Sequence, residues 1–139
     1  MREKTFKEPP NPFPEQYCLD TVGVCLEPLL ASGAICYSDS EAELLVGDFV
    51  IAWFREEAFS ANGQARVKIF VGTTDDTITL VALNPPERHR FPRSAFYAVH
   101  RIFAIEVPDG RVADLRTVEG RDRFVRSQLE GRLISPTAV

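Results

Sequence analysis

Cys25 is the residue of this sequence that is best suited to act as a nucleophile. It lies in the stretch GVCLEPLLASGAICYSD, Gly23 to Asp39, where glycine, proline and serine interrupt short apolar runs. Such residues favour turns, so the simplest interpretation is a strand, a turn over Pro28–Leu30 and a second strand. A thiol at the lip of a β-domain becomes a strong nucleophile only if another group takes its proton.

Lys68 is a candidate for a special role because of its residue type. The chain has 13 arginines and three lysines, and Lys4 and Lys7 lie in the N-terminal arm. A single lysine in the body of an arginine-rich chain suggests that an amine is needed there, because lysine can lose its proton when buried and arginine cannot. The alternative is a lysine on the solvent face of a strand, which is its usual position.

The other two cysteines, Cys18 and Cys36, are interpreted as core or edge residues. Three cysteines without paired spacing do not form a disulfide framework, and the two histidines lie far from them, so no zinc spacing occurs. We therefore expect no metal and no cofactor, and a reducing compartment, the cytoplasm.

The remaining polar candidates have structural interpretations. Glu27 and Asp48 suit turns and hydrogen bonds better than acid or base catalysis. His100, inside an apolar run, suits a hydrogen-bonded core position better than a ligand position. His89 and the Arg88, Arg90, Arg93 cluster are expected in a solvated loop, with a small anion-binding or partner patch as the alternative.

Short β-strands account for most of the chain from residue 17 onward. Alternating or continuous apolar runs with turn residues at their ends predict them. They are expected at Tyr17–Val22, Ala34–Tyr37, Phe49–Phe54, Ala65–Val71 and Thr77–Leu83, with one or two more within Phe96–Val107. Turns are expected at Gly47–Asp48, Asn62–Gly63, Asp75–Asp76 and Asn84–Pro86.

The spacing of apolar residues gives two of the predicted elements a defined face. In Ala65–Val71, the side chains of Val67, Ile69 and Val71 share one face, and those of Arg66, Lys68 and Phe70 share the other. Near the C-terminus, apolar residues at helical spacing predict a helix that Thr117 caps and Gly131 limits. These residues are Phe124, Val125, Leu129 and Leu133.

These elements predict a mostly-β fold, a compact β-domain of short strands with an added C-terminal helix. Residues 1–16 form a Pro-rich arm that is mobile or lies across a surface. Residues 17–107 form the β-domain, and residues 108–139 a C-terminal extension with the helix. The net charge of −4 argues against direct nucleic-acid binding, and neither a signal peptide nor a membrane span is found.

Four segments resemble, in order, the LexA-like, phage-repressor-like self-cleaving peptidases. The segment around Cys25-Leu26-Glu27-Pro28 resembles the family's Ser-Met-Glu-Pro nucleophile turn, with cysteine in place of serine. The other three are Val46–Ala52, which resembles a Gly-Asp strand, Arg66–Phe70, which resembles the lysine strand, and Leu80–Pro86, which resembles a strand ending in Asn-Pro. A run from Phe96 to Val107 resembles the closing strand.

This resemblance implies a LexA/signal-peptidase-like fold and a Ser-Lys type site. Cys25 then occupies the nucleophile position and Lys68 the position of the general base. Burial of the lysine amine would lower its pKa, and a thiol could give its proton to such an amine and become reactive. Main-chain N–H groups near Cys25 would have to form the oxyanion hole.

Two departures from the family shape the functional prediction. The family cleaves itself at Ala-Gly or Cys-Gly, and this chain contains neither dipeptide. Residues 1–16 are also too short for the helix-turn-helix of the family's repressors. We therefore expect a domain that does not cleave itself and acts as a homodimerisation or protein-interaction module in phage or stress-response (SOS) regulation, with a repressor or another transcription regulator as partner.

Two alternatives remain at this point. The first is an active peptidase that cuts a protein partner in trans with a Cys25–Lys68 dyad, so an enzymatic activity stays open. The second is a small-ligand β-domain unrelated to peptidases, in which Cys25 only packs. Membrane signal peptidases share the fold type implied by the resemblance, but they require a membrane segment.

Overall fold

Antiparallel strand pairing organises the chain. The computed structural model describes residues 9–21, 26–55 and 65–137, with side chains of the last stretch up to residue 130. The strands are β1 (Gln16–Asp20), β2 (Ile35–Asp39), β3 (Phe49–Phe54), β4 (Ala65–Thr73), β5 (Thr77–Leu83), β6 (Pro86–Pro92), β7 (Phe96–Glu106) and β8 (Val112–Asp114). A short 3-10 helix, η2 (Arg93–Ala95), precedes β7, and the helix α1 (Val118–Thr137) follows β8.

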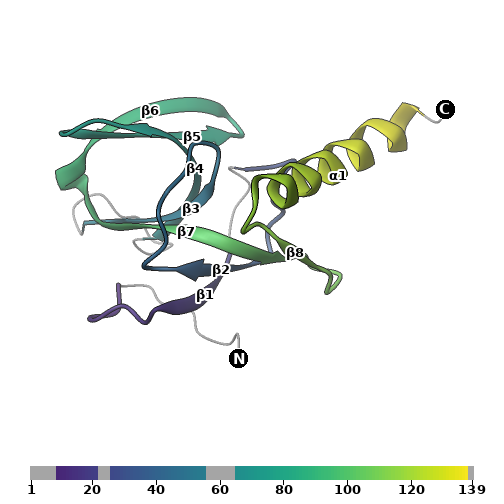
Figure 1. The fold of residues 1–139 in the computed structure, drawn as a ribbon. Coiled ribbons are helices and arrows are strands. Elements are labelled where there is room, and N and C mark those ends of the chain that lie inside the picture. The colour runs from purple at the N-terminus through teal and green to yellow at the C-terminus, as the bar shows by residue number, and fades with distance from the viewer. Residues whose placement is uncertain (1–8, 22–25, 56–64, 138–139) are drawn as a thin grey trace.

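The eight described strands form one antiparallel sheet in the order β1-β2-β7-β3-β4-β5-β6, and β8 adds to β7. The part from β7 through β3, β4 and β5 to β6 curls round into an open barrel, whereas β1 and β2 continue the sheet on the other side of β7 (Figure 1). The chain is thus mostly β with a C-terminal helix, as the sequence predicts.

β3 is buried on both faces, and its side chains enter two apolar clusters alternately. Phe49, Ile51 and Trp53 belong to the first cluster, which we call the sheet core. It also contains side chains of β1, β2, β7, the 26–30 turn and α1. Val50, Ala52 and Phe54 belong to the second cluster, the barrel core, with side chains of β4, β5 and β7. A strand buried on both faces loses the polar alternation of a surface strand, which explains the unbroken apolar run FVIAWF.

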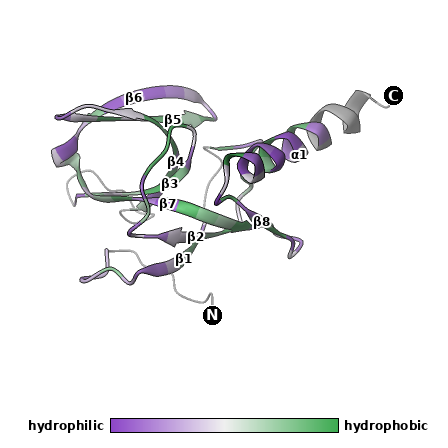
Figure 2. Cartoon of the chain, viewed as in Figure 1, coloured by the Kyte–Doolittle hydropathy of each residue, from purple (hydrophilic) through white to green (hydrophobic). Residues whose placement is uncertain are grey.

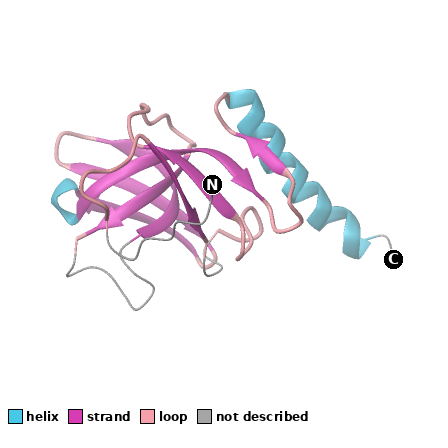
Figure 3. Cartoon of the chain, turned by 90° about the horizontal axis from the view of Figure 1, so that it is seen from below, coloured by secondary structure: helices cyan, strands magenta, loops and turns pink. Residues whose placement is uncertain are grey.

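The C-terminal segment packs against the body at its beginning. Leu115 is fully buried, and the Phe124 ring of α1 meets the Phe49 ring edge-on at a centroid distance of 6.0 Å. Thr117 caps the helix, because its Oγ accepts a hydrogen bond from the N–H of Gly120 at 3.0 Å. A Cβ at Gly120 would lie 2.3 Å from the carbonyl oxygen of Asp114, so only glycine allows this close approach. Beyond this first part, α1 extends away from the barrel (Figure 3).

The predicted strands are confirmed to within two residues at their ends. β3 and β5 match their predicted ranges, and Phe96–Val107 contains one strand, β7. The Thr117 cap is confirmed, and the predicted Asn62–Gly63 turn lies outside the described residues. Among the described helices, none combines the length and apolar character that crossing a membrane requires.

Three predictions about elements were wrong or incomplete. The segment with Arg88, His89 and Arg90 is the strand β6 and not a loop, because its backbone pairs with β5 over seven residues. β8 was not predicted, since a strand of three residues carries too little pattern to recognise. Gly131 does not end the helix, which continues to Thr137.

Candidate functional site

Lys68 lies in the middle of β4, half-buried, on the face of the barrel core. Its neighbours Val67 and Ile69 pack against the sheet core, so alternation along the strand directs Lys68 to the opposite face. The strand register agrees, because Lys68 is paired with Val50 of the barrel core. The prediction that Val67 and Ile69 lie on one face of this strand and Lys68 on the other is therefore confirmed. Among the described residues, the Lys68 amine forms no hydrogen bond or ion pair.

Cys25, the predicted nucleophile, lies outside the described residues. The turn that follows it is described: the N–H groups of Leu29 and Leu30 both donate to the carbonyl of Leu26, at 2.8 and 3.1 Å. The side chains of these three leucines are buried in the sheet core. The described end of the nucleophile segment therefore packs against one face of the sheet, and Lys68 emerges on the other.

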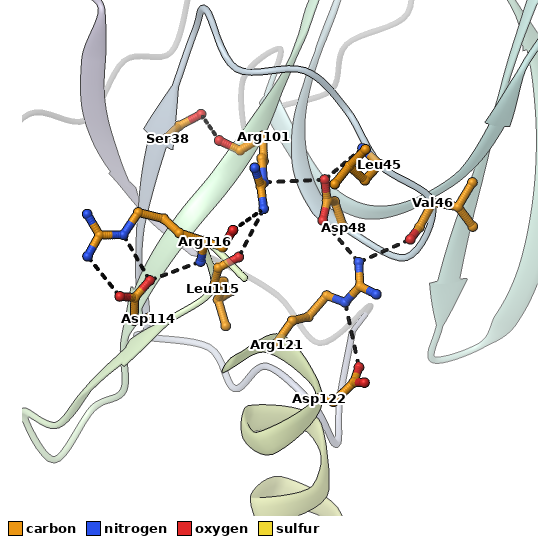
Figure 4. A network of polar contacts seen from close by, with 10 residues as sticks. All are labelled: Ser38, Leu45, Val46, Asp48, Arg101, Asp114, Leu115, Arg116, Arg121 and Asp122. Atoms are coloured by element: carbon orange, nitrogen blue, oxygen red, sulfur yellow. Dashed lines mark hydrogen bonds and ion pairs between the residues drawn. The ribbon is translucent and has the colours of Figure 1, made fainter. Parts of the chain in front are cut away.

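Asp48 is the centre of a buried ion-pair network that the sequence did not reveal (Figure 4). Its carboxylate accepts a hydrogen bond from the N–H of Leu45 at 2.8 Å. It also faces Arg101 Nε of β7 at 3.4 Å and Arg121 Nη1 of α1 at 3.0 Å. The Asp48 side chain is 3% exposed, so both ion pairs are shielded from water. The prediction that Asp48 serves in hydrogen bonding is confirmed, whereas its two arginine partners were missed.

The two arginines join the barrel to the start of α1. Arg101 Nη2 donates to the carbonyl oxygens of Leu115 and Arg116 at 3.3 and 2.8 Å, and Arg121 Nη1 donates to the Val46 carbonyl at 3.0 Å. Gly47 makes room for this contact. Its φ is 93°, and a Cβ there would lie 3.0 Å from the guanidinium carbon of Arg121. A possible signal of this network in the sequence was Arg101, a charged residue inside the apolar run of β7.

His100 is a buried, hydrogen-bonded core residue, as the sequence predicts. Trp53 Nε1 donates to the Tyr17 hydroxyl at 2.8 Å, and that hydroxyl lies 2.6 Å from His100 Nδ1. Since the tyrosine oxygen receives the tryptophan hydrogen, its own hydrogen is available to Nδ1. This chain of donors favours the neutral histidine that carries its proton on Nε2.

Burial explains the titration behaviour of this group. It lowers the pKa of His100 to about 4, against the opposing effect of Asp39, which raises it. Burial also raises the pKa of Tyr17 to about 12. The described part of the N-terminal arm covers the same place, because the Phe13 ring meets the His100 ring edge-on at 4.5 Å. This part of the Pro-rich arm therefore lies across the body.

A groove runs between α1 and the end of the sheet. It has a volume of about 450 Å³, and Val107, Val112 and Ala113 line it on the strand side. Phe124 and Gln128 line it on the helix side. Val112 of β8 is 62% exposed. Leu129 of α1 is 39% exposed and lies outside this groove, in a separate depression that it lines with Val125.

The other predicted residues have structural positions. Cys18 and Cys36 are buried in neighbouring strands, and burial raises the pKa of the Cys36 thiol. Glu27 lies in the 26–29 turn. Among the described residues, no cluster of three His, Cys, Asp or Glu side chains could hold a metal ion.

Comparisons with known proteins leave the family open. No family model, no curated protein and no solved structure matches this chain.

The buried histidine predicts a loss of stability in mild acid. Its pKa in the folded protein is below the ordinary value of about 6.5, so the unfolded chain binds a proton first as the pH falls. We expect the free energy of unfolding to fall by about 2 kcal/mol between about pH 6.5 and about pH 5. Urea denaturation at several pH values measures this change.

The control for this experiment uses both histidines of the chain. His100→Phe keeps a ring but cannot titrate, so the pH dependence in this interval should disappear. His89→Gln removes the other histidine, on the exposed strand β6, and should retain the pH dependence. An unchanged slope in His100→Phe would contradict the assignment.

The Asp48 network predicts a large difference between two aspartate variants. Asp48→Asn leaves two shielded arginines without their counter-charge and should lower the free energy of unfolding by about 3 kcal/mol. Asp114→Asn breaks a pair with Arg116 whose side chains are both more than half exposed, and should cost less than about 1 kcal/mol. Equal losses in urea denaturation would show that Asp48 does not hold α1 to the barrel.

Proposed function

We propose that this chain is a LexA-like domain that does not cleave itself and acts as a homodimerisation and protein-interaction module in phage or stress-response regulation. The LexA-like part of the proposal depends on the four ordered segments of the sequence. The observation that carries the interaction part is that exposed apolar side chains line two depressions along α1, Val112 in the groove beside β8 and Leu129 in the other.

The dimension of this surface suits a dimer interface. α1 has 20 residues, which corresponds to a length of about 30 Å, and only its first part packs against the body. Stable interfaces bury roughly 800 Å² on each partner, and a helix of this length with β8 beside it can supply such an area. The helix could thus extend the pairing that the resemblance implies for this domain.

The charges on α1 favour a second copy of the chain as the occupant. Val125 and Leu129 lie in a shallow depression that is also lined by Asp122, Arg126 and Glu130. A surface that carries both signs around an apolar centre can be complementary to itself, as a two-fold interface requires. A separate repressor or regulator could then bind the assembled dimer.

The position of Lys68 supports a role without self-cleavage. A lysine acts as base only if its amine reaches the nucleophile. Lys68 faces the barrel core, whereas the leucines directly after Cys25 are buried in the sheet core. The observation that favours the alternative, a peptidase acting in trans, is that Lys68 is half-buried and its amine has no counter-charge among the described residues.

The dimer predicts that charge in the groove or in the depression around Leu129 separates the subunits. We expect the wild type to show a concentration-dependent mass in sedimentation equilibrium. Leu129→Glu and Val112→Glu should each weaken self-association at least tenfold, because a buried, unpaired carboxylate is costly. Tyr97→Glu is the control, since Tyr97 is 50% exposed but lies at the other end of β7. A monomer at all concentrations, or sensitivity only to Tyr97→Glu, would overturn the proposed dimer.

The proposal also predicts an ordinary thiol at Cys25. The rate of iodoacetamide alkylation at Cys25, followed by peptide mass spectrometry, should rise with pH around the usual thiol pKa of about 8.5. Lys68→Ala should leave this profile unchanged, as should Lys68→Arg. A midpoint well below that value which is lost in Lys68→Ala would show an assembled dyad and favour the peptidase.

A further inference from the structure

β6 is the last strand of the sheet and has an exposed edge. It follows β5 in the strand order, and no other described strand pairs with it. Six of its seven residues are exposed, and the strand is hydrophilic over most of its length (Figure 2). An edge strand offers its unpaired N–H and C=O groups to another extended chain.

The register shows which backbone groups face outward. The N–H of Arg93, just after β6, donates to the carbonyl of Asp76 at 2.8 Å. In an antiparallel ladder such bonded positions recur at every second residue, so Phe91, His89 and Glu87 also turn their backbone groups toward β5. Arg88 and Arg90 therefore direct their N–H and C=O groups to the open edge.

The same two residues carry charge without a partner. Arg88 and Arg90 are exposed and form no ion pair among the described residues. Two other exposed arginines do have a carboxylate close by, since Arg111 has Asp109 at 2.8 Å and Arg116 has Asp114 at 2.8 Å. Their side chains share one face of β6, about 7 Å apart along the strand.

Two prolines define the length of this edge. Pro86 and Pro92 stand at the two ends of β6, at outward-facing positions where their lack of an N–H leaves no unpaired donor. The donors on the edge are therefore those of two residues, which suits a short segment and not a long sheet. A second copy of β6 would place arginines opposite arginines, which is unfavourable.

We propose that the edge of β6 binds a short, extended, acidic segment of a partner protein by strand addition. Backbone hydrogen bonds to Arg88 and Arg90 align the segment, and acidic side chains at alternate positions face the two guanidinium groups. A nucleic acid fits less well, because it has no groups that match the alternating donors and acceptors of a strand edge. This site goes beyond the proposed dimer and lies on a different part of the molecule.

The test measures binding of a defined peptide to the full chain. The probe is a fluorescein-labelled peptide with the sequence GTTETETTG, and fluorescence anisotropy gives its dissociation constant at low salt. We expect saturable binding that the double variant R88S/R90S weakens about tenfold, from the loss of two exposed charge pairs. R55S/R116S is the matched control, because it removes two exposed arginines that lie outside both β6 and the proposed dimer surface, and it should leave binding unchanged.

Two further probes separate strand addition from simple charge attraction. A peptide with N-methyl groups on alternate amides keeps both glutamates but cannot form the ladder, so its binding should be lost. A peptide with lysine in place of both glutamates should also fail to bind. Circular dichroism of R88S/R90S checks that the fold is retained.

Several results would overturn this inference. Equal binding of the methylated peptide, or equal weakening in R55S/R116S, would show attraction by charge alone. Tighter binding of a single-stranded oligonucleotide than of the acidic peptide would indicate a nucleic-acid surface. If no peptide binds and R88S/R90S aggregates faster than the wild type, the arginines and prolines serve only to protect the edge. None of these outcomes depends on the dimer, which sedimentation tests separately.

Discussion

The burial of β3 on both faces is the constraint on which the rest of the structure depends. A strand without a solvent face needs apolar partners on each side, and the chain supplies them as the sheet core and the barrel core. The curl of β4, β5 and β6 provides one set of partners. β1, β2, the 26–30 turn and the start of α1 provide the other. The two faces also determine where every side chain of the neighbouring strand β4 can point, including Lys68.

Charged contacts fix the orientation of α1, which apolar packing alone does not determine. Phe124 alone would anchor α1 to the sheet core by a contact without direction. The carboxylate of Asp48 adds direction, because it meets an arginine of β7 and an arginine of α1. The first turns of the helix are therefore held to the barrel by oriented contacts, whereas its later turns extend freely from the body (Figure 3).

Sequence patterns predicted the strands well because those signals are local. The apolar run of β3 and the alternation of β5 each lie within seven residues, and their boundaries match the structure. β6 was not recognised because charged, exposed side chains occupy most of this edge strand and leave no apolar pattern. Its only signals were two prolines, whose spacing suits the two ends of an edge strand. The short β8 is a strand only because β7 lies beside it.

The candidate site was less predictable because it depends on contacts between distant residues. Sequence suggested that His100 would be hydrogen-bonded, but its partner Tyr17 lies 83 positions away. Asp48 was recognised as a turn residue, whereas Arg121 comes from a helix 73 positions later. The Cys25–Lys68 pairing was hard to predict for the same reason. Strand alternation shows which side chains of a strand share a face, but only the packing shows whether that face meets the sheet core or the barrel core.

Trp53 gives this fold a built-in optical probe. It is the only tryptophan of the chain and is fully buried. Its ring lies 5.5 Å from Phe13 of the arm and 6.1 Å from Tyr17 of β1, centroid to centroid. The emission of one indole therefore depends on the arm, on β1 and on β3 together, and reports whether the N-terminal segment is seated on the sheet core. Trp53 faces the sheet core, whereas Phe91 of β6 contacts Phe54 on the barrel-core face of β3, so events at the outer edge of β6 should leave that emission unchanged.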